Sequence, residues 1–262
     1  MTVGPILTWL FVPADRPDRI EKAIASRAHA VIVDLEDGVP DTRKEVARDV
    51  LAEHLSERHA KPVFVRINAA NADDLAAAAE LPLAGIVVPK VQDVSDLPDG
   101  VRVHAMIESA LGVERAFEIA SQQQVDGIAL GEADLRSQTG AEEAGLGWSR
   151  ARIVNAAVAA GLPRPPQAVY MEVRDLAGLA ESCRLGKAFG HLGRQAIHPA
   201  QLEVIEQAYL PTAHEVEIAR ATVEALETAG VGVVGDRTFV DHAMLGAAQD
   251  VLALADAYGT AS

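Results

Sequence analysis

Short apolar runs rich in β-branched residues alternate along the chain with longer stretches in which apolar residues recur at helical spacing. The strand-like runs are residues 7–12, 30–35, 63–67, 85–88, 103–107, 127–130, 168–171 and 195–197. Helical spacing occurs at residues 16–27, 42–58, 113–122, 149–160 and 176–189. This alternation is typical of βα units arranged around a parallel sheet.

Polar residues follow nearly every expected strand. They are Pro-Ala-Asp-Arg at 13–16, Asp-Leu-Glu-Asp at 34–37, Arg-Ile-Asn at 66–68, Pro-Lys at 89–90, Glu-Ser at 108–109, Glu-Ala-Asp at 132–134, Glu172 and His-Pro at 198–199. In a (β/α)8 barrel the carboxyl ends of the strands form one shared mouth that carries the catalytic groups. Because no Gly-rich phosphate fingerprint follows the first strand, we predict an α/β chain folded as a TIM barrel instead of a doubly wound sheet.

Composition agrees with one large domain and narrows the partners. The 262 residues are 49% hydrophobic, close to the roughly 250 residues of a typical barrel. The net charge of −15 argues against nucleic acid as a partner but still allows a local cationic pocket for a small anion. The lone Cys183 excludes an internal disulfide. With no apolar stretch of about 18 residues and no basic leader, we expect a cytoplasmic protein that does not enter membranes.

Two acids end neighbouring strands: Glu108 ends the expected fifth strand and Asp134 follows the sixth. Both carboxylates would then face the same side of the mouth. Magnesium commonly takes one or two protein carboxylates and fills its other positions with water and substrate oxygens. We predict a Mg²⁺ site at this pair. The alternative is that either acid only caps the helix after it.

Three acids, Asp34, Glu36 and Asp37, crowd the end of the expected second strand. Their mutual repulsion indicates a nearby positive centre. They could orient metal-bound waters or accept from an arginine across the mouth. The alternative is pairing with Lys44 or Arg48 in the following helix.

Arg66 projects from a buried strand, where a guanidinium needs an anionic partner. It could grip a substrate carboxylate or oxyanion in bidentate fashion, or form a structural salt bridge to Glu36 or Asp37. For Lys90 we expect a carboxylate partner and a raised pKa, which disfavours a Schiff-base role. His198 is expected to be a packed, hydrogen-bonded side chain, and no histidine spacing indicates zinc.

Seven motifs in order resemble one family. They are Leu-Phe-Val-Pro at 10–13, Val-Asp-Leu-Glu-Asp-Gly-Val at 33–39, Val-Arg-Ile-Asn at 65–68, Pro-Lys at 89–90, Ile-Glu-Ser at 107–109, Ala-Leu-Gly-Glu-Ala-Asp at 129–134 and Ala-Ile-His-Pro at 196–199. Together they resemble the HpcH/HpaI aldolase and citrate lyase β-subunit family, and within it the stand-alone citrate lyase β-like proteins and the malyl-CoA and citramalyl-CoA lyases. The resemblance runs from about residue 8 to residue 255.

The resemblance implies a TIM barrel, usually assembled as a homotrimer, that binds Mg²⁺ through Glu108 and Asp134. It implies that Arg66 grips the substrate's carboxylate or developing oxyanion. The expected reaction cleaves a 3-hydroxyacyl-CoA of the citramalyl-CoA or malyl-CoA type to acetyl-CoA and a 2-oxo acid, with thioester hydrolysis as a further activity. The CoA ester and the 2-oxo acid are the expected partners, and pyruvate and glyoxylate are not distinguished.

The C-terminal region resembles the family's lid. Arg-Thr-Phe-Val-Asp at 237–241 precedes an apolar helix expected at 243–258, which makes Asp241 the candidate acid or base at the acetyl-CoA carbon, acting in a neighbouring subunit. Ala243 stands where lyases usually have proline. We expect residues 1–210 to form the barrel and residues 211–262 the C-terminal helices and lid, within the same structural domain.

The remaining candidate residues complete the expected site. Gly-Glu-Ala-Asp at 131–134 replaces the commoner Gly-Ala-Glu-Asp, so we retain Asp134 as a ligand and not Glu132. We expect Arg16 to meet CoA phosphates, whereas for Arg19 a surface salt bridge is favoured. Catalytic roles are assigned to Arg66, Asp241, Glu36 and Asp37, and substrate-binding roles to Arg66, Glu108, Arg16 and Lys90.

Three other functions stay open on the sequence. The chain could be a citrate lyase β-type subunit that acts on an acyl-carrier thioester, or an aldolase on free hydroxy-oxo acids. A CoA-binding protein without turnover is the third, and the charged mouth argues against it because unused buried charges cost stability.

Overall fold

The computed structural model describes residues 4–229, 232–234 and 238–259. Arg237 of the expected lid motif lies outside the described residues. Contacts within the chain divide it into two compact units. The larger is Leu7–Ala208, and the C-terminal unit comprises the described residues of Met1–Ile6 and Tyr209–Ser262.

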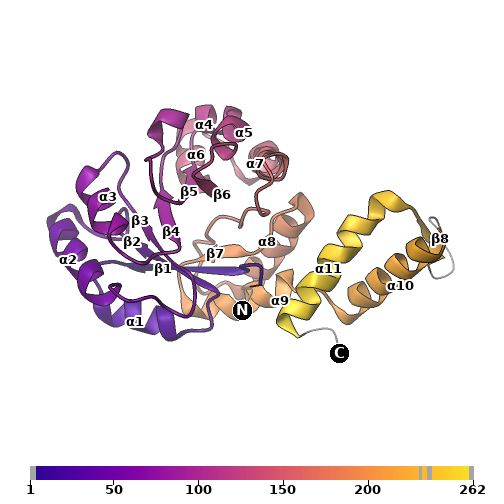
Figure 1. Cartoon of the computed structure of the whole chain (residues 1–262). Coiled ribbons are helices and arrows are strands. Elements are labelled where there is room, and N and C mark those ends of the chain that lie inside the picture. The colour runs from indigo at the N-terminus through magenta and orange to yellow at the C-terminus, as the bar shows by residue number, and fades with distance from the viewer. Residues whose placement is uncertain (1–3, 230–231, 235–237, 260–262) are drawn as a thin grey trace. The chain divides into compact units, whose positions relative to one another are not determined.

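A curved, all-parallel sheet forms the centre of the larger unit (Figure 1). Its strands are β1 (Thr8–Pro13), β2 (Ala30–Asp34), β3 (Val63–Arg66), β4 (Gly85–Val88), β5 (Val103–Ile107), β6 (Val125–Leu130) and β7 (Arg194–Ala196). They pair in the order β6-β5-β4-β3-β2-β1-β7. Strands β2, β4 and β5 are buried along their whole length, as expected for strands covered on both faces.

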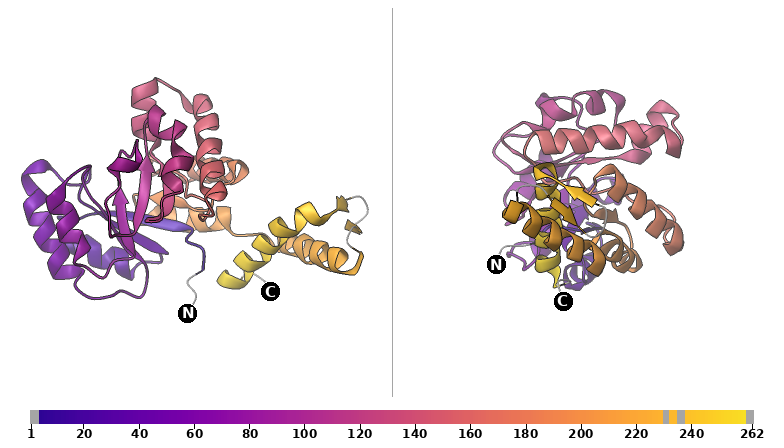
Figure 2. Two further views of the ribbon diagram at one scale, coloured as in Figure 1. Left: turned by 45° about the horizontal axis from the view of Figure 1, so that its top comes forward. Right: turned by 90° about the vertical axis from the view of Figure 1, so that its right-hand side faces the viewer.

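Helices follow the strands and lie outside the sheet, as Figure 1 and the two further views of Figure 2 show. They are α1 (Pro17–Ala25), α2 (Lys44–His54), α3 (Ala72–Ala79), α4 (Ala110–Glu114), α5 (Ala116–Ala120), α6 (Glu132–Thr139), α7 (Gly147–Ala159), α8 (Leu176–Phe189) and α9 (Leu202–Tyr209). Short 3-10 helices are η1 (Asp41–Arg43), η2 (Val94–Asp96), η3 (Glu143–Leu146) and η4 (Pro199–Gln201). Each longer helix buries one apolar face; α8, for example, buries Leu179 and Cys183.

The closed eight-stranded barrel predicted from the sequence is wrong in one respect. Residues 168–171 do not form a strand, and the sheet is not closed between β6 and β7. The segment runs beside β7 with one parallel bridge, Gln167 to Arg194. Pro163, Pro165 and Pro166 precede it and lack the N–H groups that a ladder needs, and the Tyr170 carbonyl accepts from a side chain, Gln201 Nε2, at 2.9 Å.

Side chains from alternate strands fill the interior in layers, as in TIM barrels. Trp9 of β1, Phe64 of β3 and His104 of β5 pack together, with ring centroids 5.1 Å apart for Trp9–Phe64 and 5.0 Å for Trp9–His104. Gln195 of β7 pairs in register with Trp9. Burial lowers the pKa of His104 to about 4, so the ring is neutral within this layer.

The next layer of side chains lies two residues further along the chain from each of these positions. Its members are Phe11, Arg66, Met106 and Ile197, and all four line the same cavity. This layer therefore forms the bottom of the cavity that contains the candidate site.

The C-terminal unit pairs two helices. Helices α10 (Ala213–Ala229) and α11 (Leu245–Tyr258) pack side by side, and β8 (Gly232–Val234) forms an antiparallel pair with β9 (Thr238–Val240). The 3-10 helix η5 (His242–Met244) leads into α11, which begins two residues later than predicted. No helix in the described ranges is long and apolar enough to cross a membrane.

Candidate functional site

A cavity of about 520 Å³ lies at the carboxyl ends of the strands in the larger unit. Its charged lining residues are Arg19, Asp34, Asp37, Arg66, Glu108, Glu132, Asp134 and Arg136. Its apolar lining includes Phe11, Met106, Leu130, Val169 and Ile197. The polar ends of the strands therefore meet at one mouth, as the sequence predicted.

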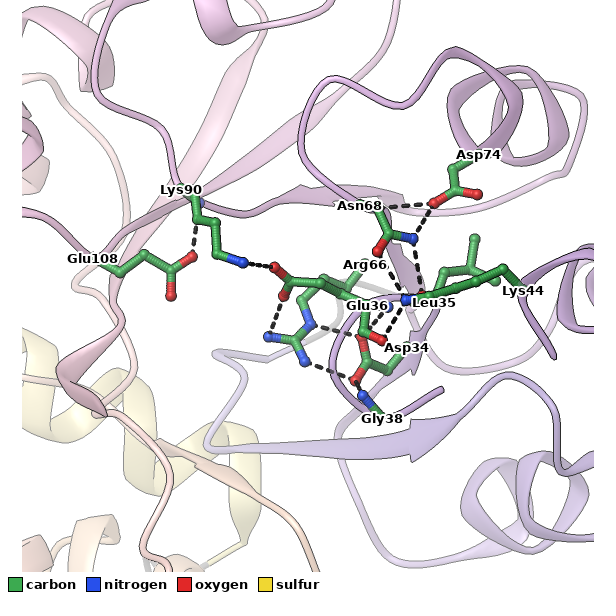
Figure 3. Close-up of polar contacts among 10 residues, drawn as sticks. All are labelled: Asp34, Leu35, Glu36, Gly38, Lys44, Arg66, Asn68, Asp74, Lys90 and Glu108. Carbon is green, nitrogen blue, oxygen red and sulfur yellow. Dashed lines mark hydrogen bonds and ion pairs between the residues drawn. The ribbon is translucent and has the colours of Figure 1, made fainter. Parts of the chain in front are cut away.

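Arg66 is held in place by carboxylates from the end of β2 (Figure 3). Its Nε and Nη2 each donate to one oxygen of Asp34 at 2.7 Å, and its Nη1 lies 2.9 Å from Glu36 Oε2. Asp34 is fixed in turn by the N–H groups of Glu36 and Gly38, both at 2.9 Å. The guanidinium also lies 5.0 Å from the centre of the Phe11 ring. Its planar fork is thus oriented before any ligand arrives.

Glu36 bridges two cations. Opposite Arg66, its Oε1 accepts from Lys90 Nζ at 2.7 Å. Burial raises the pKa of Glu36, while Arg66 and Lys90 oppose that rise. The hydrogen bond to Glu36 raises the pKa of Lys90, as expected from the sequence, so this amine is a poor Schiff-base nucleophile.

Lys44 and Arg48 do not pair with the acidic cluster, contrary to the alternative considered for it. Lys44 Nζ donates to the carbonyls of Leu35 and Glu36 at 2.6 Å and to Asn68 Oδ1 at 2.8 Å (Figure 3). Arg48 instead pairs with the buried Asp74 at 2.9 Å. Lys44 therefore holds the backbone of the β2 loop, which positions the carboxylates without neutralising them.

Glu108 meets Asp134 across the ends of β5 and β6. The buried Glu108 carboxyl accepts from the backbone N–H of Lys90 at 2.7 Å and makes a side-chain contact with Asp134. Lys90 adopts φ 56°, a left-handed conformation that is unusual for a non-glycine residue. Burial, and after it the contact with Asp134, raises the pKa of Glu108. Within the described part of the chain neither acid forms an ion pair.

This pair fits magnesium by its donor chemistry. A Cβ atom at Gly131 would lie 2.4 Å from Glu108 Oε2. The Glu108 carboxylate therefore occupies the space that any side chain at position 131 would fill, which requires glycine there. Two hard oxygen donors that lack a protein cation are the set that Mg²⁺ takes while keeping waters. Among the described residues, no group of three or more His, Cys, Asp or Glu side chains is arranged to hold a metal, which disfavours a fully protein-coordinated centre.

Another carboxylate of the cavity, Glu132, is already paired. Both its oxygens accept from Arg150, from Nε and Nη2, at 2.7 Å. Arg150 is 2% exposed and also contacts Glu143 at 2.7 Å. Sequence reasoning set Glu132 aside as a ligand but did not find its partner, which lies 18 residues away on α7.

The HpcH/HpaI aldolase/citrate lyase family matches residues 7–100 and 96–199. The chain belongs to this family. A (3S)-malyl-CoA thioesterase of Cereibacter sphaeroides is 34% identical over 97% of this chain and 95% of its own length. The citrate lyase subunit beta of Escherichia coli is 32% identical over 96% of this chain and 94% of its own. The crystal structure of protein CitE from Mycobacterium tuberculosis with magnesium, acetoacetate and coenzyme A superposes with a TM-score of 0.86 at 32% identity, covering 97% of this chain and 99% of that one.

Arg16 and Arg19, which follow β1, do not lie where the sequence predicted. Arg16 pairs with Asp18 at 3.3 Å, both about half exposed, and is not among the residues that line the cavity. Arg19, for which a surface salt bridge was favoured, lines the cavity. Arg16 is the N-cap residue of α1 and Arg19 lies within its first turn, a difference that the sequence pattern did not indicate. Arg136 also lines the cavity and was not singled out from the sequence.

Two further candidates have local roles in the structure. His198 Nδ1 accepts from the N–H of Ala200 at 3.1 Å and caps η4, so the side chain is hydrogen-bonded as expected, but it is exposed and not packed as predicted. Asp241 belongs to the C-terminal unit, where Oδ1 accepts from the N–H of Ala243 at 3.0 Å and caps η5. Its expected place in a family lid remains a prediction.

Proposed function

We propose that this protein is a Mg²⁺-dependent carbon–carbon lyase that cleaves a 3-hydroxyacyl-CoA of the citramalyl-CoA or malyl-CoA type to acetyl-CoA and a 2-oxo acid. The observation that carries the proposal is the placement of two opposite binding elements in one cavity. Glu108 and Asp134 offer oxygens to a cation, and Arg66 offers N–H groups to an anion. A 2-oxo acid presents both a chelating oxygen pair and a carboxylate, so it can engage both elements.

Glu108 and Asp134 would hold the metal. When bound, Mg²⁺ would supply Lewis-acid stabilisation of the oxygen that becomes the 2-oxo group. The magnesium and acetoacetate in the solved CitE complex support this assignment.

Arg66 would hold the substrate's anionic end. A guanidinium has five N–H donors, and contacts with Asp34 and Glu36 involve all three nitrogens but leave one N–H free on each terminal nitrogen. The guanidinium that carries these free donors has a fixed orientation. Because Asp34 and Glu36 already orient it, little entropy is lost when it binds a carboxylate.

Cleavage requires a proton at the acetyl-CoA carbon. As the bond between the hydroxyl-bearing carbon and the acetyl-CoA carbon breaks, the hydroxyl gives up its proton and becomes the 2-oxo group, and the electron pair of the broken bond leaves an enolate, which must take up a proton. We assign this role to Asp241 of a neighbouring subunit in a homotrimer, on the resemblance of its segment to the family lid. Arg19 and Arg136, at the cavity wall, are candidates for contact with CoA phosphates.

A second candidate is hydrolysis of the same kind of thioester. The (3S)-malyl-CoA thioesterase relative favours it, because that protein is similar to this chain over almost its whole length. The citrate lyase subunit beta similarly supports a third reading, in which the acyl group is carried on a protein thiol instead of CoA.

Product analysis separates these reactions. The protein is incubated with Mg²⁺ and either citramalyl-CoA or malyl-CoA, and acetyl-CoA, 2-oxo acid and free CoA are measured. A lyase releases acetyl-CoA and pyruvate or glyoxylate, whereas a thioesterase releases free CoA and the hydroxy diacid. No product from either ester would rule out both CoA-ester activities.

Asp241→Asn tests the proton donor. Turnover is expected to fall by about 10²- to 10⁴-fold, the usual contribution of an acid or base, while Mg²⁺ binding stays intact. Asp250→Asn makes the same change at an exposed position of α11 and should leave the rate unchanged. Mixing Asp241→Asn with Glu108→Ala subunits should restore part of the activity if the aspartate acts in a neighbouring subunit. An unchanged Asp241→Asn rate would remove it from the mechanism.

A further inference from the structure

Glu132 is a further carboxylate in the cavity that holds the proposed metal ligands. It is the first residue of α6, two residues before Asp134, and both side chains line the cavity with Glu108. On position alone, Glu132 could bind the same cation as its neighbour. The structure instead directs its carboxylate to Arg150.

Arg150 is built into the molecule as a fixed partner for Glu132. Its side chain is 3% exposed, and it donates through Nε and Nη2 to the two oxygens of Glu132. Its remaining terminal nitrogen contacts Glu143, so all three nitrogens are engaged by acids. The adjoining acids more than offset burial and raise the pKa of Arg150, so the guanidinium keeps its charge.

The start of α6 has few other anchors. Gly131 stands at the N-cap position and offers no side-chain cap, and Leu135 is the one residue of α6 that is buried. Helix α7, in contrast, buries Arg150, Ile153, Ala156 and Ala157. The Glu132–Arg150 pair therefore ties the first turn of α6, which carries Asp134, to a well-packed helix.

We propose that Arg150 is a positioning residue that withholds Glu132 from the metal and keeps the site a two-carboxylate site. This inference rests on the proposed function, because it takes Glu108 and Asp134 as the Mg²⁺ ligands. A third free carboxylate would favour Ca²⁺, which takes six to eight oxygens, over Mg²⁺, which keeps several waters. It would also add negative charge next to an anionic substrate.

Glu132→Gln tests whether the glutamate is a ligand. Mg²⁺ affinity is measured by calorimetric titration of the purified protein, without substrate. Glu132→Gln should change the dissociation constant by no more than about twofold, whereas Asp134→Asn should weaken binding by about tenfold or more. A loss of about tenfold in Glu132→Gln would show that Glu132 coordinates the metal and would overturn the inference.

Arg150→Met tests whether Arg150 keeps Glu132 from binding the metal. Released Glu132 should raise affinity for Ca²⁺ relative to Mg²⁺ by about tenfold, and adding Glu132→Gln to Arg150→Met should return that ratio to the wild-type value. Arg184→Met is the matched control, because it breaks an exposed Arg–Glu pair on α8. An unchanged ratio in Arg150→Met, or a changed ratio that Glu132→Gln does not reverse, would contradict the proposal.

The two levels of the proposal fail in different ways. A wild-type protein that binds no Mg²⁺ would overturn the metal site and this inference together. A wild-type protein that binds Mg²⁺ through Asp134 and loses it in Glu132→Gln would overturn only this inference. If Arg150→Met does not fold, the result of Glu132→Gln still decides the role of Glu132.

Discussion

Glu36 and Glu108 stand in the same kind of position but have opposite surroundings. Each follows a buried strand of the larger unit, each is 5% exposed, and burial raises the pKa of both carboxyls. Glu36 lies between Arg66 and Lys90, at 2.9 and 2.7 Å. Glu108 receives one backbone N–H and otherwise faces another acid, Asp134.

The charges around Glu36 are balanced within the protein, whereas the charges around Glu108 are balanced only when a ligand binds. Around Glu36, every buried charge has an opposite partner, so the network can hold Arg66 rigid without substrate. Around Glu108, two carboxylates meet and neither forms an ion pair with a described residue, which is unfavourable until a metal binds. Changes in the two regions should therefore alter the stability of the metal-free protein in opposite directions.

The largest change in stability is expected when the network around Glu36 loses Arg66. Arg66→Met should lower the free energy of unfolding of the metal-free protein by about 3–5 kcal/mol, because Asp34 is left as a buried, uncompensated charge and Glu36 keeps Lys90 alone of its two cationic partners. Urea unfolding in the presence of a chelator measures this change. Arg43→Met removes a half-exposed arginine whose pair with Asp15 is equally short, at 2.6 Å, and should cost less than about 1 kcal/mol. Equal losses in the two variants would show that burial does not set the value of the Arg66 network.

A change of stability in the opposite direction is expected at the Glu108–Asp134 pair. Glu108→Gln should raise the free energy of unfolding of the metal-free protein at neutral pH by about 1–2 kcal/mol, because the neutral amide needs neither the burial of a charge nor the proton that the Glu108 carboxyl must take up on folding, and it retains an acceptor for the Lys90 N–H. The same variant should lose the stabilisation that Mg²⁺ gives the wild type. Glu118→Gln, at an exposed position of α5, should change stability by less than about 0.5 kcal/mol. A destabilised Glu108→Gln protein would contradict the comparison.

The pH dependence of this gain has a definite sign. Burial and Asp134 raise the pKa of Glu108 from 4.5 to about 8, so the folded protein binds this proton more tightly than the unfolded chain. The stability that the protonated carboxyl contributes is complete below pH 4.5 and is lost as the pH rises toward 8. The advantage of Glu108→Gln over the metal-free wild type should therefore grow across that interval. A constant difference would place the pKa of Glu108 near its ordinary value.

The sequence predicted which residues meet at the mouth better than it predicted how they pair. Alternation of strands and helices brought Glu108 and Asp134 to neighbouring strand ends, since parallel strands share one carboxyl edge. The sequence offered Asp34, Glu36 and Asp37 as partners of Arg66 without ranking them. Asp34 makes the bidentate contact and Glu36 an ion pair, and the N–H groups of the loop after β2 fix the Asp34 carboxylate. The choice among acids a few residues apart depends on loop geometry, which periodicity does not encode.

Two other differences have long-range causes. The expected strand at 168–171 has the apolar character of a strand, but Gln201, 31 residues further along the chain, donates to the Tyr170 carbonyl. Glu132 has the same residue type and neighbourhood as a metal ligand, and its role depends on Arg150, 18 residues away in another helix. Local pattern cannot identify such partners, because they become neighbours only after the helices pack.

The smallest effect is expected at the residue that links the two regions. Lys90 contacts Glu36 through Nζ and Glu108 through its backbone N–H, and its side chain is 47% exposed. Lys90→Met removes only the side-chain contact, and Arg66 still compensates Glu36. The free energy of unfolding should fall by less than about 1 kcal/mol, and the KM for the CoA ester should rise by no more than about tenfold with kcat retained. Loss of kcat by about 10³-fold or more would instead indicate covalent catalysis by the lysine, which its raised pKa argues against.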